Sequence, residues 1–133
     1  MKKDTLGNLI FTRVQRVKNK QIIETYIWTK KNYEEHELRH SISSTKALHE
    51  IEQTIQLPDV VTVGPNAKQK SLYRVLTYQD SRNCRAVRVW RVICYIRGKY
   101  HYIIATEFED WTSSENVIHY LEKVVWKKSG SLI

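Results

Sequence analysis

Two long extended segments joined by a short glycine turn limit most strongly the folds open to this chain. Cys84–Ile96 and Tyr100–Phe108 are rich in Val, Ile and aromatic residues and flank Arg97-Gly98-Lys99. Residues of these types favour strands, and a compact turn with glycine at its centre makes the two strands antiparallel neighbours. The pattern predicts an antiparallel β-meander.

Earlier segments extend this sheet. Val60–Val63 and Ser71–Tyr78 have the same strand composition, so an antiparallel sheet is expected over residues 59–108. Leu9–Val17 and Gln21–Thr29 flank Lys18-Asn19-Lys20, where asparagine can take a positive φ. This predicts a β-hairpin within residues 1–31.

Helices are expected in three places. Asn32 followed by Glu35 has the spacing of an N-cap with an acid at the third helical position, which predicts a short helix to about His40. A second helix is expected over 44–56, so that residues 32–57 form a helical segment ended by Pro58. A capping box at 112–115 predicts a helix over 112–126, with 127–133 as a tail. We therefore expect a single α+β domain over residues 1–133.

The composition favours a compact fold in the cytoplasm. The 133 residues are 41% hydrophobic with only 4 Gly and 2 Pro, and no apolar run approaches the ~20 residues of a membrane helix. The N-terminal residues MKKDTLGN lack the apolar region of a signal peptide. The two cysteines, Cys84 and Cys94, fall in one extended run, so we expect them to be reduced rather than bridged.

Positive charge is concentrated in two blocks. The chain has a net charge of +8; residues 1–31 carry 8 Lys/Arg against 2 acids, and residues 66–100 carry 9 against 1. Such blocks favour a polyanion partner, because each phosphate that binds Lys or Arg releases condensed counterions. A solvated basic surface with no nucleic-acid partner is the alternative.

The letters His36-Glu37-Leu38-Arg39-His40 match the pattern in which two histidines one helical turn apart bind zinc and the glutamate acts as base. The charged neighbours Glu34 and Arg39 and the lack of a clear third ligand weaken that interpretation. A surface helix with inactive histidines is a second interpretation. A third is that His36 or His40 transfers protons near neutral pH without metal.

Metal-free RNA cleavage needs a general base, a general acid and cations for the phosphorane charge. Strand alternation places Arg85 and Arg91 on one face, and Arg88 with Trp90 on the other. Arg74 shares a face with Leu72 and Leu76, so its guanidinium is expected to run along apolar surface or to occupy a polar cleft. The candidate catalytic residues are His40, Arg74, Arg88, Thr106, Tyr73 and His36, and the candidate RNA-binding residues are Arg39, Arg85, Arg91, Trp90, Lys68 and Lys70.

The order of short motifs over about residues 32–108 resembles the barnase, EndoU, colicin and RelE-like superfamily of small RNases, especially its phage and toxin branches. The motifs are Arg39-His40, Leu57-Pro58-Asp59-Val60-Val61, Leu72-Tyr73-Arg74, Ala86-Val87-Arg88-Val89 and Ile103-Ile104-Ala105-Thr106. The resemblance implies metal-independent cleavage through a 2′,3′-cyclic phosphate, with His40 as base or acid, Arg74 or Arg88 on the phosphate, and Thr106 or Tyr73 positioning it. An extra alanine, Ala105, departs from the family pattern.

The preferred hypothesis is therefore a metal-independent endoribonuclease of toxin or phage type, acting on RNA such as tRNA. A non-catalytic RNA-binding or interaction module comes second, and a zinc hydrolase third. No cofactor or metal is implied for the first two. A basic toxic RNase would also be expected to meet an acidic inhibitor or immunity protein.

Overall fold

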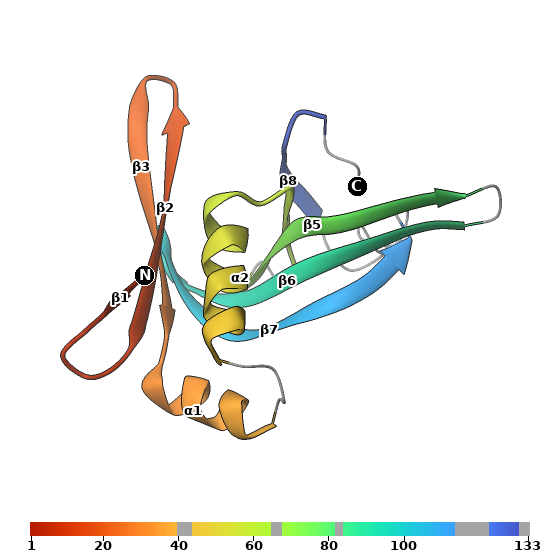
Figure 1. The fold of residues 1–133 in the computed structure, drawn as a ribbon. Helices are drawn as coiled ribbons and strands as arrows, with labels where there is room; N and C mark the ends of the chain where they lie inside the picture. Colours follow the sequence, from red (N-terminus) through yellow and green to blue (C-terminus); the bar gives the residue numbers. More distant parts are fainter. Residues whose placement is uncertain (40–43, 65–67, 82–83, 114–122, 131–133) are drawn as a thin grey trace.

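The computed structural model describes residues 1–39, 44–64, 68–81, 84–113 and 123–130. These residues form two helices and one eight-stranded mixed sheet with the order β1-β2-β3-β7-β6-β5-β4-β8 (Figure 1). The strands are β1 (Lys2–Lys3), β2 (Leu9–Val17), β3 (Lys20–Trp28), β4 (Val60–Val63), β5 (Gln69–Ser81), β6 (Cys84–Gly98), β7 (His101–Ser113) and β8 (Lys123–Lys127). The helices are α1 (Lys30–Arg39) and α2 (Ser44–Gln56). The α+β class expected from the sequence is confirmed, with strands dominating.

The N-terminal hairpin forms where it was predicted. β2 and β3 are antiparallel, and Lys18 and Asn19 take φ values of 50° and 65° in the turn between them. Two consecutive residues of positive φ give the turn whose twist matches the flanking strands. The sequence did not indicate how this hairpin joins the remaining sheet: β3 runs parallel to β7, with Tyr26 opposite Tyr102.

The predicted meander is also confirmed, with longer strands than expected. β5, β6 and β7 are successive antiparallel neighbours. At the turn between β6 and β7 the left-handed conformation is taken by Tyr100, at φ 61°, rather than by Gly98. The Tyr100 carbonyl accepts a hydrogen bond from the Thr25 N–H, so this turn is tied to β3.

The sheet curls around α2. This helix contacts β2 and also the neighbouring strands β5 and β6, and β3 and β7 lie between β2 and β6 in the strand order. Its apolar residues Ile51 and Ile55 are fully buried in a core cluster with Trp28 and Trp90. One helix can reach both halves of the sheet only if the sheet is strongly curved, as Figure 1 shows.

Helix α1 begins one turn earlier than the capping pattern suggested. The Thr29 hydroxyl accepts the Asn32 N–H at 3.3 Å, so Thr29 and not Asn32 caps the helix. The Asn32 amide instead donates to the carbonyl oxygens of Ile104 and Ala105, both at 3.0 Å. Thr106 pairs with Ile93 and Ile104 with Cys94, so Ala105 is the extra residue of a β-bulge. Ala105 therefore has a structural role in β7.

The prediction of a helix over 112–126 is wrong at both of its ends. Residues 112–113 complete β7, and residues 123–127 form β8, which is antiparallel to β4. Residues 114–122 lie outside the described residues. Part of the expected tail is also ordered, because Lys127 pairs with Val60 and the Lys128 N–H donates to the Asp59 carbonyl at 2.8 Å. Val124, Val125 and Trp126 are β-branched or aromatic, and pairing with β4 favours an extended chain over the helical spacing.

Two expectations from composition are met in part. Cys94 is a free, buried thiol, and the side chain of Cys84 lies outside the described part. Burial raises the pKa of the Cys94 thiol, so it packs as a small apolar group. Within the described ranges, neither helix has the length and hydropathy needed to cross a bilayer.

Candidate functional site

The sheet separates the residues predicted to share one RNA pocket. Arg74 is opposite Trp90 across β5 and β6, and Trp90 packs against α2. Tyr73 is opposite Arg91 in the same ladder. Because successive strand residues point to opposite faces, Tyr73 and Arg91 lie on the face away from α2. The alternation expected for Arg88 and Arg91 holds, and it prevents the predicted residues that the structure describes from surrounding a single cleft.

Arg74 and Arg88 are each engaged with a carboxylate. Arg74 donates to Glu50 through Nη2, and its Nε lies 3.4 Å from the Thr54 hydroxyl. The Arg88 Nη1 lies 3.2 Å from the Glu109 carboxylate. A phosphate at either guanidinium therefore has to share it with an acid.

The opposite face places Arg91 among aromatic rings. Its guanidinium lies 5.1 Å from the Tyr73 ring centroid and 5.8 Å from that of Phe108. Tyr73 is only 4% exposed and belongs to a second core cluster. Thr106 lies on β7 opposite Ile93. The ring of Tyr73 consequently offers little surface on which a base could stack.

Two of the predicted RNA-binding residues are buried. Trp90 is fully buried in the core and Lys70 is 6% exposed. The Lys70 ammonium contacts the Glu24 carboxylate at 2.5 Å and the Tyr26 hydroxyl at 2.7 Å. Burial therefore removes Trp90 and Lys70 from any surface that RNA reaches. Lys68, just before β5, is exposed.

His36 is a half-buried partner of the sheet. Its Nε2 lies 3.1 Å from a Glu107 carboxylate oxygen, and its ring meets Trp28 edge to face at 5.0 Å. Burial raises the pKa of Glu107 to about 7, and the Glu50 carboxylate acts in the same direction. His40 and the side chains of Arg39 and Arg85 lie outside the described residues. Among the residues that are described, no group of three His, Cys, Asp or Glu side chains is arranged to hold a metal ion.

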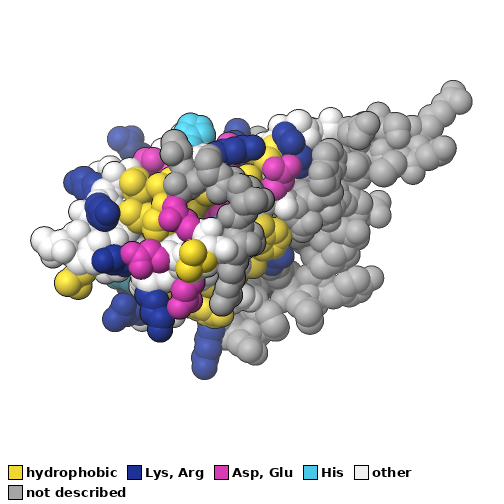
Figure 2. Space-filling view, turned by 60° about the horizontal axis from the view of Figure 1, so that its bottom comes forward, with side chains coloured by type: hydrophobic (Ala, Val, Ile, Leu, Met, Phe, Trp, Pro, Cys, Tyr) yellow, Lys and Arg dark blue, Asp and Glu magenta, His cyan; other side chains and the backbone are white. Residues whose placement is uncertain are grey.

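The α1 side of the molecule has no uniform positive charge. Figure 2 brings this side forward and shows acidic and hydrophobic side chains among the lysines and arginines. Glu34, Glu35 and Glu37 are exposed on α1, and Lys30 lies 3.9 Å from Glu34. The basic residues on this side are thus partly neutralised locally.

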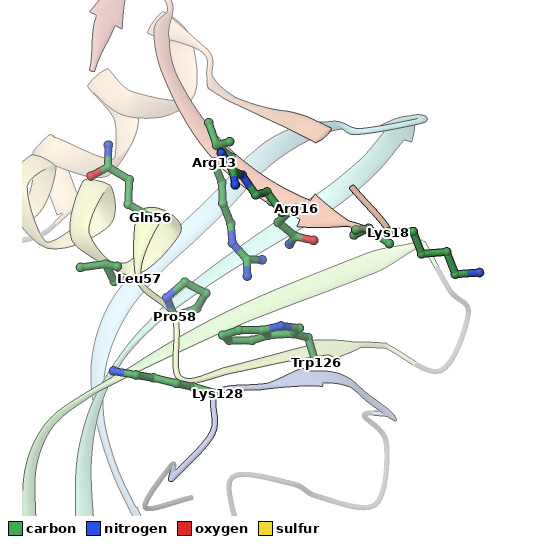
Figure 3. A pocket seen from close by; sticks show the side chains of 11 residues that line it. Arg13, Arg16, Lys18, Gln56, Leu57, Pro58, Trp126 and Lys128 are labelled. Carbon is green, nitrogen blue, oxygen red and sulfur yellow. The ribbon is translucent and has the colours of Figure 1, made fainter. Parts of the chain in front are cut away.

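A groove at the opposite end of α2 gathers positive charge around an aromatic ring. We call it the basic groove; its walls are Arg13–Lys18 of the hairpin, Gln56–Pro58 at the end of α2, and Trp126 and Lys128 at the end of β8, and its volume is about 720 Å³. Figure 3 shows the Arg13 side chain extending from β2 towards Pro58 and the Trp126 ring, while Lys18 extends outwards at the rim. Arg13 lies 4.8 Å from the Trp126 ring centroid.

The curl of the sheet produces this groove. β2 and β8 lie near opposite ends of the strand order, yet Arg13 and Trp126 are in contact. The groove is therefore the seam where the two ends of the curved sheet approach each other across the end of α2. Pro58 ends the helix at this seam, and the Lys128 N–H bond to Asp59 holds the chain after β8 against it.

The electrostatics of the basic groove follow from which of its charges are paired. Arg13 is buried and lies 3.4 Å from Glu24, so its charge is partly compensated. Arg16, Lys18 and Lys128 are exposed. Among the described residues, no carboxylate and no histidine lines the groove. The groove can bind an anion that carries an apolar or aromatic portion.

Sequence reasoning missed this site for an identifiable reason. The block of positive charge over residues 1–31 was recognised, but Trp126 was assigned to the end of a helix. The alternating pattern that predicted the hairpin does not show which strand comes to lie beside it. The β-branched and aromatic run at 124–126 was the signal that could have placed Trp126 on a strand.

The chain was also compared with known proteins. No protein-family model matches it, and searches of curated proteins and of solved structures return no significant match. The resemblance to small RNases stays a prediction from the sequence motifs.

Proposed function

We propose that this chain binds single-stranded nucleic acid, RNA in the first place, in the basic groove. The observation that carries the proposal is the position of a partly exposed Trp126 ring among the exposed cations Arg16, Lys18 and Lys128. Phosphates supply the negative charge that these cations attract, and bases supply flat apolar surface. Both features occur together in an unpaired nucleotide.

The Trp126 ring favours unpaired bases over a duplex. It is 37% exposed, and Pro58 and Leu57 of the same groove add apolar surface. Bases in a duplex are already stacked on each other, whereas an unpaired base can stack on an aromatic side chain for about 1–3 kcal/mol. The volume of about 720 Å³ lies within the usual range of ligand pockets.

Binding without cleavage is proposed for this groove. Cleavage of RNA needs a base for the 2′-hydroxyl and an acid for the leaving oxygen. The titratable residues that line the groove within the described part of the chain are arginines and lysines, and this lining has no histidine or carboxylate to act as the base. The groove therefore fits the second hypothesis from the sequence, an RNA-binding module, better than the endoribonuclease.

Fluorescence anisotropy with a labelled single-stranded RNA in EDTA tests the proposal. We expect saturable binding at low salt that weakens as salt rises, and intact RNA on a gel afterwards. Trp126→Ala should weaken binding roughly tenfold through the lost stacking, while Trp126→Phe should retain most of the affinity. Thermal melting of both variants checks that they remain folded.

The same experiment separates the alternatives. Disappearance of full-length RNA in EDTA would favour the endoribonuclease over the binding module. Equal affinity of the wild type, Trp126→Ala and Trp126→Phe proteins would show that RNA does not use the basic groove. A complete lack of binding at low salt would overturn both ideas.

A further inference from the structure

A second pocket adjoins the basic groove and differs from it in chemistry. It has a volume of about 480 Å³ and shares Leu57 and Lys128 with the groove. Its polar lining includes Asp59, Arg74 and Ser129. A single wall made by Leu57 and Lys128 thus separates a groove suited to a base from a pocket that holds two cations, a carboxylate and a hydroxyl. We call it the polar pocket.

The Asp59 carboxylate is held in a fixed orientation. Its Oδ2 accepts the Val75 N–H at 2.7 Å, and its backbone carbonyl accepts the Lys128 N–H at 2.8 Å. Among the described residues, the bond from the Val75 N–H is the one hydrogen bond to the Asp59 side chain. The Asp59 Oδ1 can therefore accept a hydrogen bond from a ligand in the polar pocket. A carboxylate repels phosphate but accepts strongly from hydroxyl groups.

The two cations of the polar pocket, Arg74 and Lys128, can bind a phosphate that lies beside a hydroxyl group of the ligand. Lys128 is exposed between the two cavities. Arg74 also contacts Glu50 and the Thr54 hydroxyl, and its side chain is 21% exposed. A chain of nucleotides has this arrangement of groups, because each ribose hydroxyl lies next to a phosphate.

We propose that Asp59 accepts a hydrogen bond from a ribose 2′-hydroxyl, and that the polar pocket thereby makes this chain prefer RNA to DNA. The proposal rests on the proposed function, because it needs a strand in the basic groove with its backbone continuing past Lys128. Acidic side chains accept ribose 2′-hydroxyls in dinucleotide sites, and the 2′-hydroxyl is the group that lets a protein tell RNA from DNA.

The test compares three strands of one sequence as RNA, as DNA and as 2′-O-methyl RNA. The wild-type protein should bind RNA at least about tenfold more tightly than either other strand, because only RNA can donate to the carboxylate. Asp59→Asn keeps an oxygen for the Val75 N–H but presents an NH₂ group to the ligand. This variant should bind RNA and 2′-O-methyl RNA within about twofold of each other, because both strands can accept from that group.

The control is Glu52→Gln on α2, which removes one negative charge outside the polar pocket, where the Glu52 carboxylate is paired with the Met1 N-terminal ammonium at 2.7 Å. It should change the affinity for all three strands by the same factor. Equal affinity of the wild-type protein for RNA and DNA, or an unchanged preference in Asp59→Asn, would overturn the role of Asp59 while leaving nucleic-acid binding intact. Failure of all three strands to bind would overturn the proposed function itself.

Discussion

At the scale of single residues, some side chains that the sequence suggests for RNA binding instead make contacts inside the protein. Lys70 is the clearest case, since it is buried with Glu24 and Tyr26 and its ammonium lies 4.0 Å from the Tyr102 ring centroid. Burial lowers the pKa of Lys70, and the contact with Glu24 opposes that shift. Glu24 also accepts from Gln15 at 3.0 Å, so its charge is satisfied from several strands.

Removing Lys70 should therefore destabilise the protein rather than only weaken nucleic-acid binding. Lys70→Met leaves the Glu24 carboxylate buried without its closest cation, which should lower the free energy of unfolding by about 3 kcal/mol or more. Urea unfolding followed by tryptophan fluorescence measures this. Lys68→Met, at an exposed neighbour, should change stability by less than about 0.5 kcal/mol. A stable Lys70→Met protein with weakened RNA affinity would place Lys70 at the surface instead.

The buried Glu107 gives the protein a specific dependence of stability on pH. Burial raises its pKa from 4.5 to about 7 in the folded state. Between these values the folded protein keeps a proton on Glu107 that the unfolded chain has lost, so the contribution of Glu107 to stability is greatest below pH 4.5 and falls as the pH rises to about 7. Relative to Glu107→Gln, the wild type should lose about 1.4 kcal/mol per pH unit in this window. Parallel curves for the two proteins would contradict the raised pKa.

The sequence correctly predicted which face of a strand a side chain lies on, because alternation along that one strand determines it. Arg74 shares a face with Leu72, and its guanidinium lies in a partly polar site, as expected. The partners of a charged residue were not predictable in the same way. Glu24 and Lys70 are 46 positions apart and lie on strands that are not neighbours. Only the curl of the sheet brings them together.

At the scale of elements, polar contacts add to a small apolar contact in attaching α1 to the sheet. Tyr33 packs against the core beside Trp28, while the exposed surface of the helix carries several acids and no continuous apolar stripe. The Asn32 amide binds two carbonyl oxygens at the β7 bulge, and His36 contacts Glu107. The sequence predicted the end of this helix to within one residue but placed its start three residues too late, because Asn32 was assigned to capping and the bulge that it binds is 72 residues away.

Asn32→Ala should remove the attachment of α1 to the bulge. The carbonyl groups of Ile104 and Ala105 lose their donor, so the free energy of unfolding should fall by about 2 kcal/mol. Asn32→Asp cannot donate either and should cost at least as much. Chemical denaturation measures both, with the exposed Lys31→Ala as the control. An unchanged stability in Asn32→Ala would show that the two hydrogen bonds do not hold the helix.

The C-terminal element shows why local spacing misled the sequence analysis. Thr112 to Glu115 has the letters of a capping box, yet Thr112 pairs with Val87 in the ladder between β6 and β7. Likewise Val124 pairs with Thr62 in β4. Long-range pairing decides both segments, and no window of a few residues contains that information.

At the scale of the whole molecule, the positive charge of the sequence favours a polyanion partner, but the position of each cation along the chain does not show which cations lie together in the fold. The positive block at 1–31 was expected to attract a polyanion, and its residues Arg16 and Lys18 line the basic groove. Much of the other block, over 66–100, is paired with acids or divided between the faces of the sheet. The curl of the sheet therefore determines which cations lie close together, and Arg16 and Lys18 lie together in the basic groove near Trp126.

The salt dependence of RNA affinity in matched charge variants tests this most directly. Arg16→Ala/Lys18→Ala removes two cations from the basic groove, and Lys30→Ala/Lys31→Ala removes two from α1 at the other end of the molecule. For single strands each phosphate contact contributes about 0.7 to the slope of log affinity against log salt. We predict that the groove variant lowers the magnitude of the slope by about 1.4 and that the α1 variant leaves it unchanged. Equal slopes for the two variants would contradict RNA binding in the basic groove.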